Sequence, residues 1–227
     1  MGAKLADEVK FDDIAYEFIT ESLLIFEQEI VDSKKKLIAL NDISQYLKTF
    51  NVFSQDDYFN IADNVKNYSS KLLKKSHQAQ GIIIASQNYY QPNGFKNGNK
   101  VLDCLQHAIK IATNFIDPIT TVEVYVDVLD SYLEYFEKAV EEISTTEISN
   151  LVALINNNID IMFDENQHPI SISLTSSSIL NVKLNAQMVL DHFKNLLSKV
   201  QQMRQHDQKW NEIDIAGPSL KYLPNPN

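Results

Sequence analysis

Apolar positions recur with helical spacing along almost the whole chain. In residues 99–116, and again in 118–138, they follow the i, i+3, i+4 pattern of an amphipathic helix. Asp117-Pro118 separates the two segments, because proline is tolerated only in the first turn of a helix. The second segment is apolar on two opposite sides, and such a helix must be covered on both. The pattern therefore predicts a helix that lies inside a stack of antiparallel helix hairpins.

The same spacing predicts about eight helices in all. The other expected helices cover residues 12–32, 33–53, 54–75, 78–90, 145–162 and 180–208. A break is expected in the 78–90 helix near Gly81. Turn residues predict a loop over 91–98, and 166–178 is expected to form a polar connection. Helix pairs of this length are typical of HEAT-like repeats. The sequence thus predicts an all-α fold, a HEAT-like α-solenoid that is a fragment of a longer one.

Both ends of the chain are expected to lie outside this solenoid, which should span residues 12–209. Residues 1–11 are expected to be disordered or derived from cloning. Residues 210–227 hold three of the six prolines of the chain. Proline-rich polar segments rarely bury enough apolar surface to fold, so a flexible C-terminal tail is expected.

The chain is acidic, and its acidity is concentrated in one stretch. A net charge of −10 argues against sequence-independent binding of nucleic acid, which rests on Lys and Arg. Twelve of the thirty acidic residues lie between 117 and 165, where Lys138 is the only basic residue. A solvated face or a docking surface for a basic partner would each explain this excess. Since no apolar run approaches the roughly 20 residues of a membrane span, no direct membrane insertion is expected.

No pattern typical of an enzyme is present. The five histidines share no metal-ligand spacing, and there is no glycine-rich phosphate loop. The lone cysteine, Cys104, lies on the apolar face of its predicted helix and is expected to be a core residue. We therefore expect no catalytic site, no metal and no cofactor, and a single buried thiol fits a cytosolic protein.

Four segments, in order, resemble the large scaffold subunit of retromer, the vacuolar protein sorting-associated protein 35 family. They are YEFITESLLIFEQEIVDSK at 16–34, SKLLKK at 70–75, KVLDCLQHAIKIA at 100–112, and the helix after Asp117-Pro118. The resemblance covers most of residues 16–155. It implies a C-terminal fragment of a non-catalytic α-solenoid scaffold.

The resemblance also implies partners. In this family the C-terminal half holds a phosphoesterase-fold subunit in its concave face, and the N-terminal half, absent here, holds an arrestin-like subunit. The complex retrieves transmembrane cargo from endosomes to the Golgi or the plasma membrane, together with sorting nexins. A cytoplasmic protein, peripheral on endosomal membranes, is therefore expected. The alternative is a freestanding α-solenoid adaptor that binds short peptides.

Two charged patches match, by resemblance, the contact between two scaffold copies. The residues are Glu27, Gln28, Glu29, Lys71, Lys74 and Lys75. Gln28 departs from the acid that other family members carry. A simpler alternative is local: the lysines would lie at a helix C-terminus, where cations are favourable, and neighbouring Lys34 to Lys36 would offset the acids.

Two further sets of residues are candidates for contacts with partners. Asp32 matches an aspartate that is linked, in animal family members, to recruitment of an actin-regulatory complex. Tyr125, Tyr132 and Tyr135 form a stripe on the predicted 118–138 helix. This stripe would either pack between hairpins or face a partner.

Overall fold

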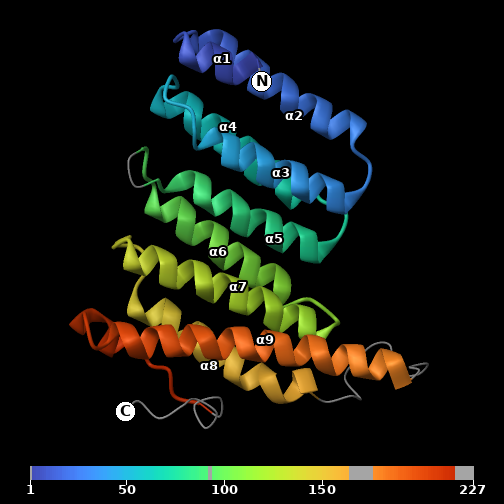
Figure 1. Cartoon of the computed structure of the whole chain (residues 1–227), viewed down its shortest axis with the longest axis vertical. Helices are drawn as coiled ribbons and strands as arrows, with labels where there is room; N and C mark the ends of the chain where they lie inside the picture. Colours follow the sequence, from blue (N-terminus) through green and yellow to red (C-terminus); the bar gives the residue numbers. More distant parts are fainter. Residues whose placement is uncertain (1, 92–93, 164–175, 218–227) are drawn as a thin grey trace. The chain divides into compact units, whose positions relative to one another are not determined.

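The computed structural model describes residues 2–91, 94–163 and 176–217 (Figure 1). The chain divides into two compact units, residues 1–111 and 112–227. Apart from an isolated bridge between Tyr90 and Lys96, all regular structure in the described residues is helical. The predicted all-α fold of an α-solenoid is confirmed. Among these described helices, none is both long and apolar enough to cross a membrane.

The first unit is built from helices that reverse direction in succession. Its elements are α1 (Gly2–Glu8), α2 (Asp12–Glu29), α3 (Ser33–Leu47), α4 (Gln55–Ser70), α5 (Lys75–Ser86), the 3-10 helix η1 (Gln87–Tyr89) and most of α6 (Gly98–Ala112). α1 packs on α2, and α3, α4 and α5 pack on one another. Short connections between α2 and α5 produce the predicted antiparallel hairpins (Figure 1).

The second unit is organised around one buried helix. Its elements are α7 (Pro118–Glu137), α8 (Thr145–Phe163), α9 (Ser176–Met203) and the 3-10 helix η3 (Gln208–Glu212). α7 packs against both α8 and α9, and twelve of its twenty residues are buried. Coverage of both apolar sides of this helix is therefore confirmed. The predicted 166–178 connection is only partly visible, since 164–175 lie outside the described residues and 176–178 begin α9.

Helix starts follow the capping signals of the sequence. The Ser54 hydroxyl accepts a hydrogen bond from the Asp57 amide (3.2 Å), and the Asp117 carboxylate accepts one from the Thr120 amide (3.1 Å) with Pro118 in the first turn. Both are favourable N-caps because they satisfy amides that have no partner inside the helix. The start of α8 at Thr145 is also as predicted.

One predicted helix ends earlier than expected. The segment expected to run from 54 to 75 ends at Ser70, and α5 begins only at Lys75. In the connection Leu72 is buried, whereas Leu73 is 86% exposed. The Gln78 side chain donates to the Leu72 carbonyl (2.6 Å) and fixes the turn. A buried leucine in a loop imitates a helical apolar position, which is why the sequence pattern placed the end of the helix too late.

The N-terminal segment is also folded, contrary to expectation. Residues 2–8 form α1, and the Asp7 side chain is 4% exposed. Its carboxylate accepts hydrogen bonds from the amides of Asn51 (2.7 Å) and Val52 (3.0 Å) and pairs with Lys4 (2.7 Å). The disorder predicted for 1–11 is thus wrong for residues 2–8. The local sequence could not indicate this helix, because the amides that bind the Asp7 carboxylate lie more than forty positions away.

The predicted flexible tail is wrong for residues 210–217. Trp210 is fully buried, and its ring meets that of Phe136 edge-on at 5.0 Å. The Asp214 amide donates to the Ser149 hydroxyl (2.8 Å), so the tail is fastened to α8. An aromatic contact between residues 74 positions apart outweighs the polar composition of this segment. Residues 218–227 of the predicted tail lie outside the described residues.

Gly81 permits the close approach of α5 to α4, and α5 passes through it without the break expected there. A Cβ at this position would lie 2.9 Å from the Ser69 Cβ. We expect Gly81→Val to lower the free energy of unfolding by about 1–3 kcal/mol through overpacking. Urea denaturation measures the loss, with Gln80→Val on the same helix as the control. Equal stability of the two variants would contradict this packing role.

Candidate docking surface

The predicted acidic patch lies in the last turn of α2. Glu27, Gln28 and Glu29 are all exposed. Negative charge at a helix C-terminus opposes the helix dipole. Lys36 partly offsets it, because its ammonium donates to the Glu27 carbonyl (3.3 Å) and lies 5.3 Å from the centre of the Phe26 ring. The compensation expected from a neighbouring lysine is therefore present.

The predicted basic patch surrounds the break between α4 and α5. Lys71 is the C-cap of α4, where a cation is favourable. Lys74 is the N-cap of α5 and Lys75 its first residue, and a cation is unfavourable at that end. All three side chains are exposed. Helix capping therefore explains Lys71 but not Lys74 or Lys75, and the local alternative is wrong for two of the three lysines.

The acidic and basic patches meet at one edge of the first unit. The Tyr68 hydroxyl donates to the Glu27 carboxylate (3.1 Å), and the Lys71 ammonium lies 5.6 Å from the centre of the Tyr68 ring. A hydrogen bond of 2.8 Å between Ser33 and His77 joins the α2–α3 corner to α5. The structure thus brings the end of α2 close to the break between α4 and α5, although the two are about forty positions apart in the sequence.

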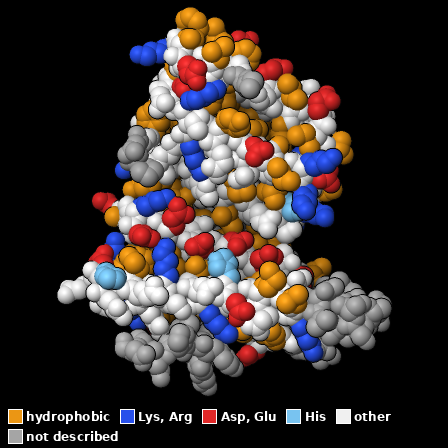
Figure 2. All heavy atoms as spheres, in the orientation of Figure 1, with side chains coloured by type: hydrophobic (Ala, Val, Ile, Leu, Met, Phe, Trp, Pro, Cys, Tyr) orange, Lys and Arg blue, Asp and Glu red, His pale blue; other side chains and the backbone are white. Residues whose placement is uncertain are grey.

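Two exposed apolar side chains, not singled out from the sequence, lie among these charges. Val31 in the α2–α3 corner is 89% exposed, and Leu73 in the α4–α5 connection is 86% exposed. Figure 2 shows charged and apolar side chains adjoining along this side of the first unit. We define the edge surface as Glu27, Gln28, Glu29, Val31, Asp32, Lys71, Leu73, Lys74 and Lys75.

Asp32 has a structural role within the edge surface. It is the N-cap of α3, and its carboxylate accepts a hydrogen bond from the Lys35 amide (2.8 Å). This bond lowers the pKa of Asp32 below its usual value, and the charge of Lys74 lowers it further. Helix capping accounts for an aspartate at this position without a partner protein.

The tyrosine stripe of α7 is buried. Tyr125, Tyr132 and Tyr135 are 2%, 1% and 2% exposed, respectively. The hydroxyl groups of Tyr125 and Thr113 share a hydrogen bond of 3.1 Å. Of the two alternatives for this stripe, packing is therefore correct, and a partner-facing role for these three side chains is wrong.

A row of carboxylates follows one side of α7. Glu123, Asp127, Asp130 and Glu134 recur at helical spacing, and Glu134 pairs with Lys138 (2.5 Å). Burial raises the pKa of Asp127 to about 7, and the charges of Glu123 and Asp130 add to the shift. Burial also raises the pKa of Glu123. The row therefore concentrates negative charge on a helix whose other sides are packed.

The potential metal ligands and the thiol of Cys104 bear on catalytic chemistry. Across residues 2–91, 94–163 and 176–217, no three His, Cys, Asp or Glu side chains are grouped so that they could hold a metal ion. Cys104 is fully buried, and burial raises the pKa of its thiol to about 12. A thiol in such surroundings is a weak nucleophile, as expected of a core residue.

Comparison with known proteins identifies the family. The family model of vacuolar protein sorting-associated protein 35 matches residues 1–158. The chain belongs to this family. It is 31% identical, over 93% of its length, to vacuolar protein sorting-associated protein 35 of Schizosaccharomyces pombe. It is 32% and 31% identical, over 68% of its length, to proteins 35B and 35A of Arabidopsis thaliana.

The chain matches only part of the length of each relative. The chain spans 26% of the length of the S. pombe protein and 21% of either Arabidopsis protein. The resemblance drawn from the four sequence segments is confirmed, as is its fragment-like extent. The names of these relatives associate them with vacuolar protein sorting.

The raised pKa of Asp127 predicts a pH-dependent stability. Because the pKa of Asp127 is about 7 in the folded chain, against about 3.8 for an ordinary aspartate, folding takes up a proton between these pH values. Stability from this group therefore rises as pH falls from 8 to 5. We expect Asp127→Asn to raise the melting temperature at pH 8, and to raise it progressively less as the pH falls from 7 towards 4.

Thermal denaturation over this pH range measures the difference between the variant and the parent chain. Glu141→Gln, at an exposed position outside the row, is the control and should shift the melting temperature little at either pH. A constant difference between Asp127→Asn and the parent across the range would contradict the assignment.

Proposed function

We propose that the chain is part of a non-catalytic scaffold of the retromer cargo-sorting complex. The observation that carries the proposal is membership of the vacuolar protein sorting-associated protein 35 family over residues 1–158. The all-α hairpin fold supports it, since α-solenoids provide extended surfaces for protein partners. The scaffold acts in retrieval of transmembrane cargo and lies peripherally on endosomal membranes.

Self-association at the edge surface is the first part of this role. A two-fold contact places the same patch of both subunits face to face, so that each patch must be self-complementary. The edge surface meets this condition because it carries carboxylates from α2 and ammonium groups from the α4–α5 connection. Lys75 favours the proposal most, because a cation at the first residue of a helix opposes the helix dipole.

Charged and apolar side chains make different contributions to the free energy of this contact. Exposed ion pairs contribute only about 0–1 kcal/mol each. Burying a Val or Leu side chain contributes about 1.5–3 kcal/mol, and the two-fold doubles the number of such side chains. Val31 and Leu73 therefore supply most of the affinity, whereas the charges fix orientation and exclude wrong partners.

Binding of the phosphoesterase-fold subunit is the second part of the role. The second unit is the proposed location, with the exposed sides of α7 and α9 as the first surfaces to test. The row of carboxylates on α7 supports this choice, because it suits a basic surface on the partner. The arrestin-like subunit, sorting nexins and cargo join through the remainder of a full-length scaffold.

A freestanding adaptor that binds short peptides is the alternative function. It differs from the scaffold in the size of the interface it offers. A folded subunit buries about 1,200–2,000 Å² or more in a stable complex and co-purifies at fixed stoichiometry. A peptide adaptor would not retain a folded subunit through size-exclusion chromatography.

Charge reversal tests the self-association. We expect Lys71→Glu, Lys74→Glu and Lys75→Glu together to weaken self-association by at least about tenfold, because like charges then face each other across the two-fold. Binding of the phosphoesterase-fold subunit should be unchanged. Sedimentation velocity at matched concentrations measures the first effect, and titration calorimetry the second.

A complementary variant is the control for this test. Glu27→Lys with Glu29→Lys should also weaken self-association when measured alone. Mixing it with the triple variant should restore association, since an all-acidic edge then meets an all-basic one. Unchanged sedimentation of the triple variant, or no recovery in the mixture, would contradict the proposed contact.

A further inference from the structure

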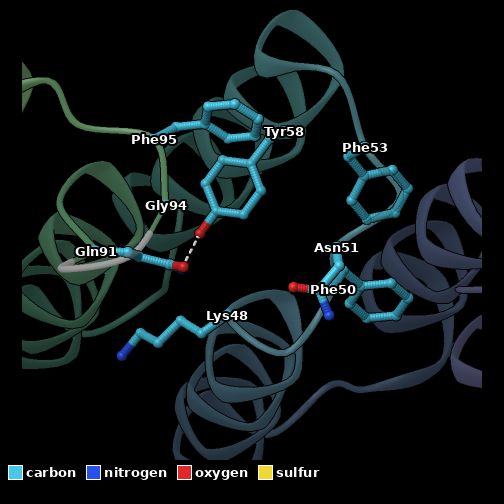
Figure 3. Close-up of a pocket in the computed structure, with 8 residues that line it drawn as sticks. All are labelled: Lys48, Phe50, Asn51, Phe53, Tyr58, Gln91, Gly94 and Phe95. Carbon is cyan, nitrogen blue, oxygen red and sulfur yellow. Dashed lines mark hydrogen bonds between the residues drawn. The ribbon is translucent and has the colours of Figure 1, made fainter.

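A pocket of about 590 Å³ opens at the end of the first unit that lies opposite the edge surface. Its lining comes from three places: the end of α3 with the α3–α4 connection, the first turn of α4, and the connection from η1 to α6 (Figure 3). The eight lining residues are Lys48, Phe50, Asn51, Phe53, Tyr58, Gln91, Gly94 and Phe95. Its volume lies within the roughly 300–1,000 Å³ typical of ligand sites.

Aromatic rings form two walls of this pocket. Phe50 and Phe53 are stacked with ring centres 5.0 Å apart, and Tyr58 lies 5.5 Å from Phe95. Figure 3 shows the first pair on the side opposite Gln91, with Tyr58 between that pair and Phe95. Aromatic pairs of this kind accept a further ring in edge-on or offset contact. The pocket therefore suits a flat aromatic or bulky apolar group.

Polar side chains also line the pocket, and they offer one positive charge and two amide groups. Lys48 is the only charged residue among the eight, and its ammonium donates to the Gln87 side chain (2.6 Å), which fixes its position beside the pocket. Asn51 and Gln91 contribute amide groups, and Gln91 donates to the Tyr58 hydroxyl. Side-chain amides can both donate to and accept from a peptide backbone. In a chain of net charge −10, a local cation beside these amides favours an anionic peptide group.

The wall on the α3–α4 side is held in place by α1. The Asp7 carboxylate accepts hydrogen bonds from the backbone amides of Asn51 and Val52, and Lys4 donates to the Thr49 carbonyl (2.7 Å). These bonds fix the loop before any ligand arrives. A preorganised wall lowers the entropic cost of binding.

We propose that this pocket binds the C-terminal residue of a peptide that ends in an aromatic or large aliphatic side chain. The side chain enters between the two ring pairs, the terminal carboxylate contacts Lys48, and Asn51 and Gln91 contact the last peptide group. A C-terminal residue carries its side chain and its carboxylate on one Cα, so a single cation and a single slot suffice. The site is separate from the edge surface and does not depend on the scaffold role.

Titration of the ¹⁵N-labelled chain by NMR tests the proposal. The probes are hexapeptides of glycine and serine that end in Phe, Trp or Leu, each with a free or an amidated C-terminus. At least one free-acid peptide should bind and shift the amide signals of Asn51, Gln91 and Phe95. We expect amidation, or Lys48→Met, to weaken binding by about tenfold or more, because a hydrogen bond to a charged group is lost.

Two variants and one small molecule complete the test. Asn51→Trp should abolish binding, because the larger side chain fills the pocket. The fold should tolerate this substitution, because the Asn51 side chain is exposed. Lys34→Met, which removes an exposed lysine from the other end of α3, should leave binding unchanged. 3-Phenylpropanoate, which keeps the ring and the carboxylate but lacks the last peptide group, should bind more weakly than the peptides.

Three outcomes would overturn the proposal. The first is no shift with any free-acid peptide at millimolar concentration. The second is equal binding of free and amidated peptides, since the carboxylate would then have no role at Lys48. The third is equal affinity for 3-phenylpropanoate, which would indicate a site for a small aromatic acid instead of a peptide.

Discussion

A helix that is apolar on two sides has to lie between two neighbours, and this constraint organises the protein. α7 meets it with α8 on one side and α9 on another. Once the sides of such helices are buried, the surfaces left for binding are mostly helix ends and connections. The edge surface and the aromatic pocket are both at such ends, on opposite ends of α3 and α4.

Local signals made much of the fold predictable. The i, i+3, i+4 spacing located the main helices, and Ser54 and Asp117 marked helix starts through side chains that cap their own helix. Each of these signals lies within a few residues of its consequence. Three features depend instead on distant partners: α1 on Asp7, the tail on Trp210, and the α4–α5 break on the burial of Leu72. Sequence spacing carries no record of such contacts.

The candidate sites could likewise be predicted only in part from the sequence. Resemblance to the family supplied the charged residues of the edge surface, but the helix boundaries decided which lysines had a local explanation. Because α4 ends at Ser70 and α5 begins at Lys75, Lys74 and Lys75 lie at a helix N-terminus, where a cation is unfavourable. The sequence had placed them at a helix C-terminus, where a cation is favourable. Val31 and Leu73 looked like ordinary apolar positions until their exposure was known. The aromatic pocket joins residues 48–58 with 91–95, and no spacing rule connects them.

The central claim is that this chain scaffolds a folded partner, and isothermal titration with the purified phosphoesterase-fold subunit of retromer tests it most directly. The account predicts one-to-one binding with a sub-micromolar dissociation constant, as a standard-size or larger interface provides. Circular dichroism on the same sample establishes that the chain is helical and folded. Absence of binding by the folded chain would contradict the scaffold function and leave the family relationship as one of architecture.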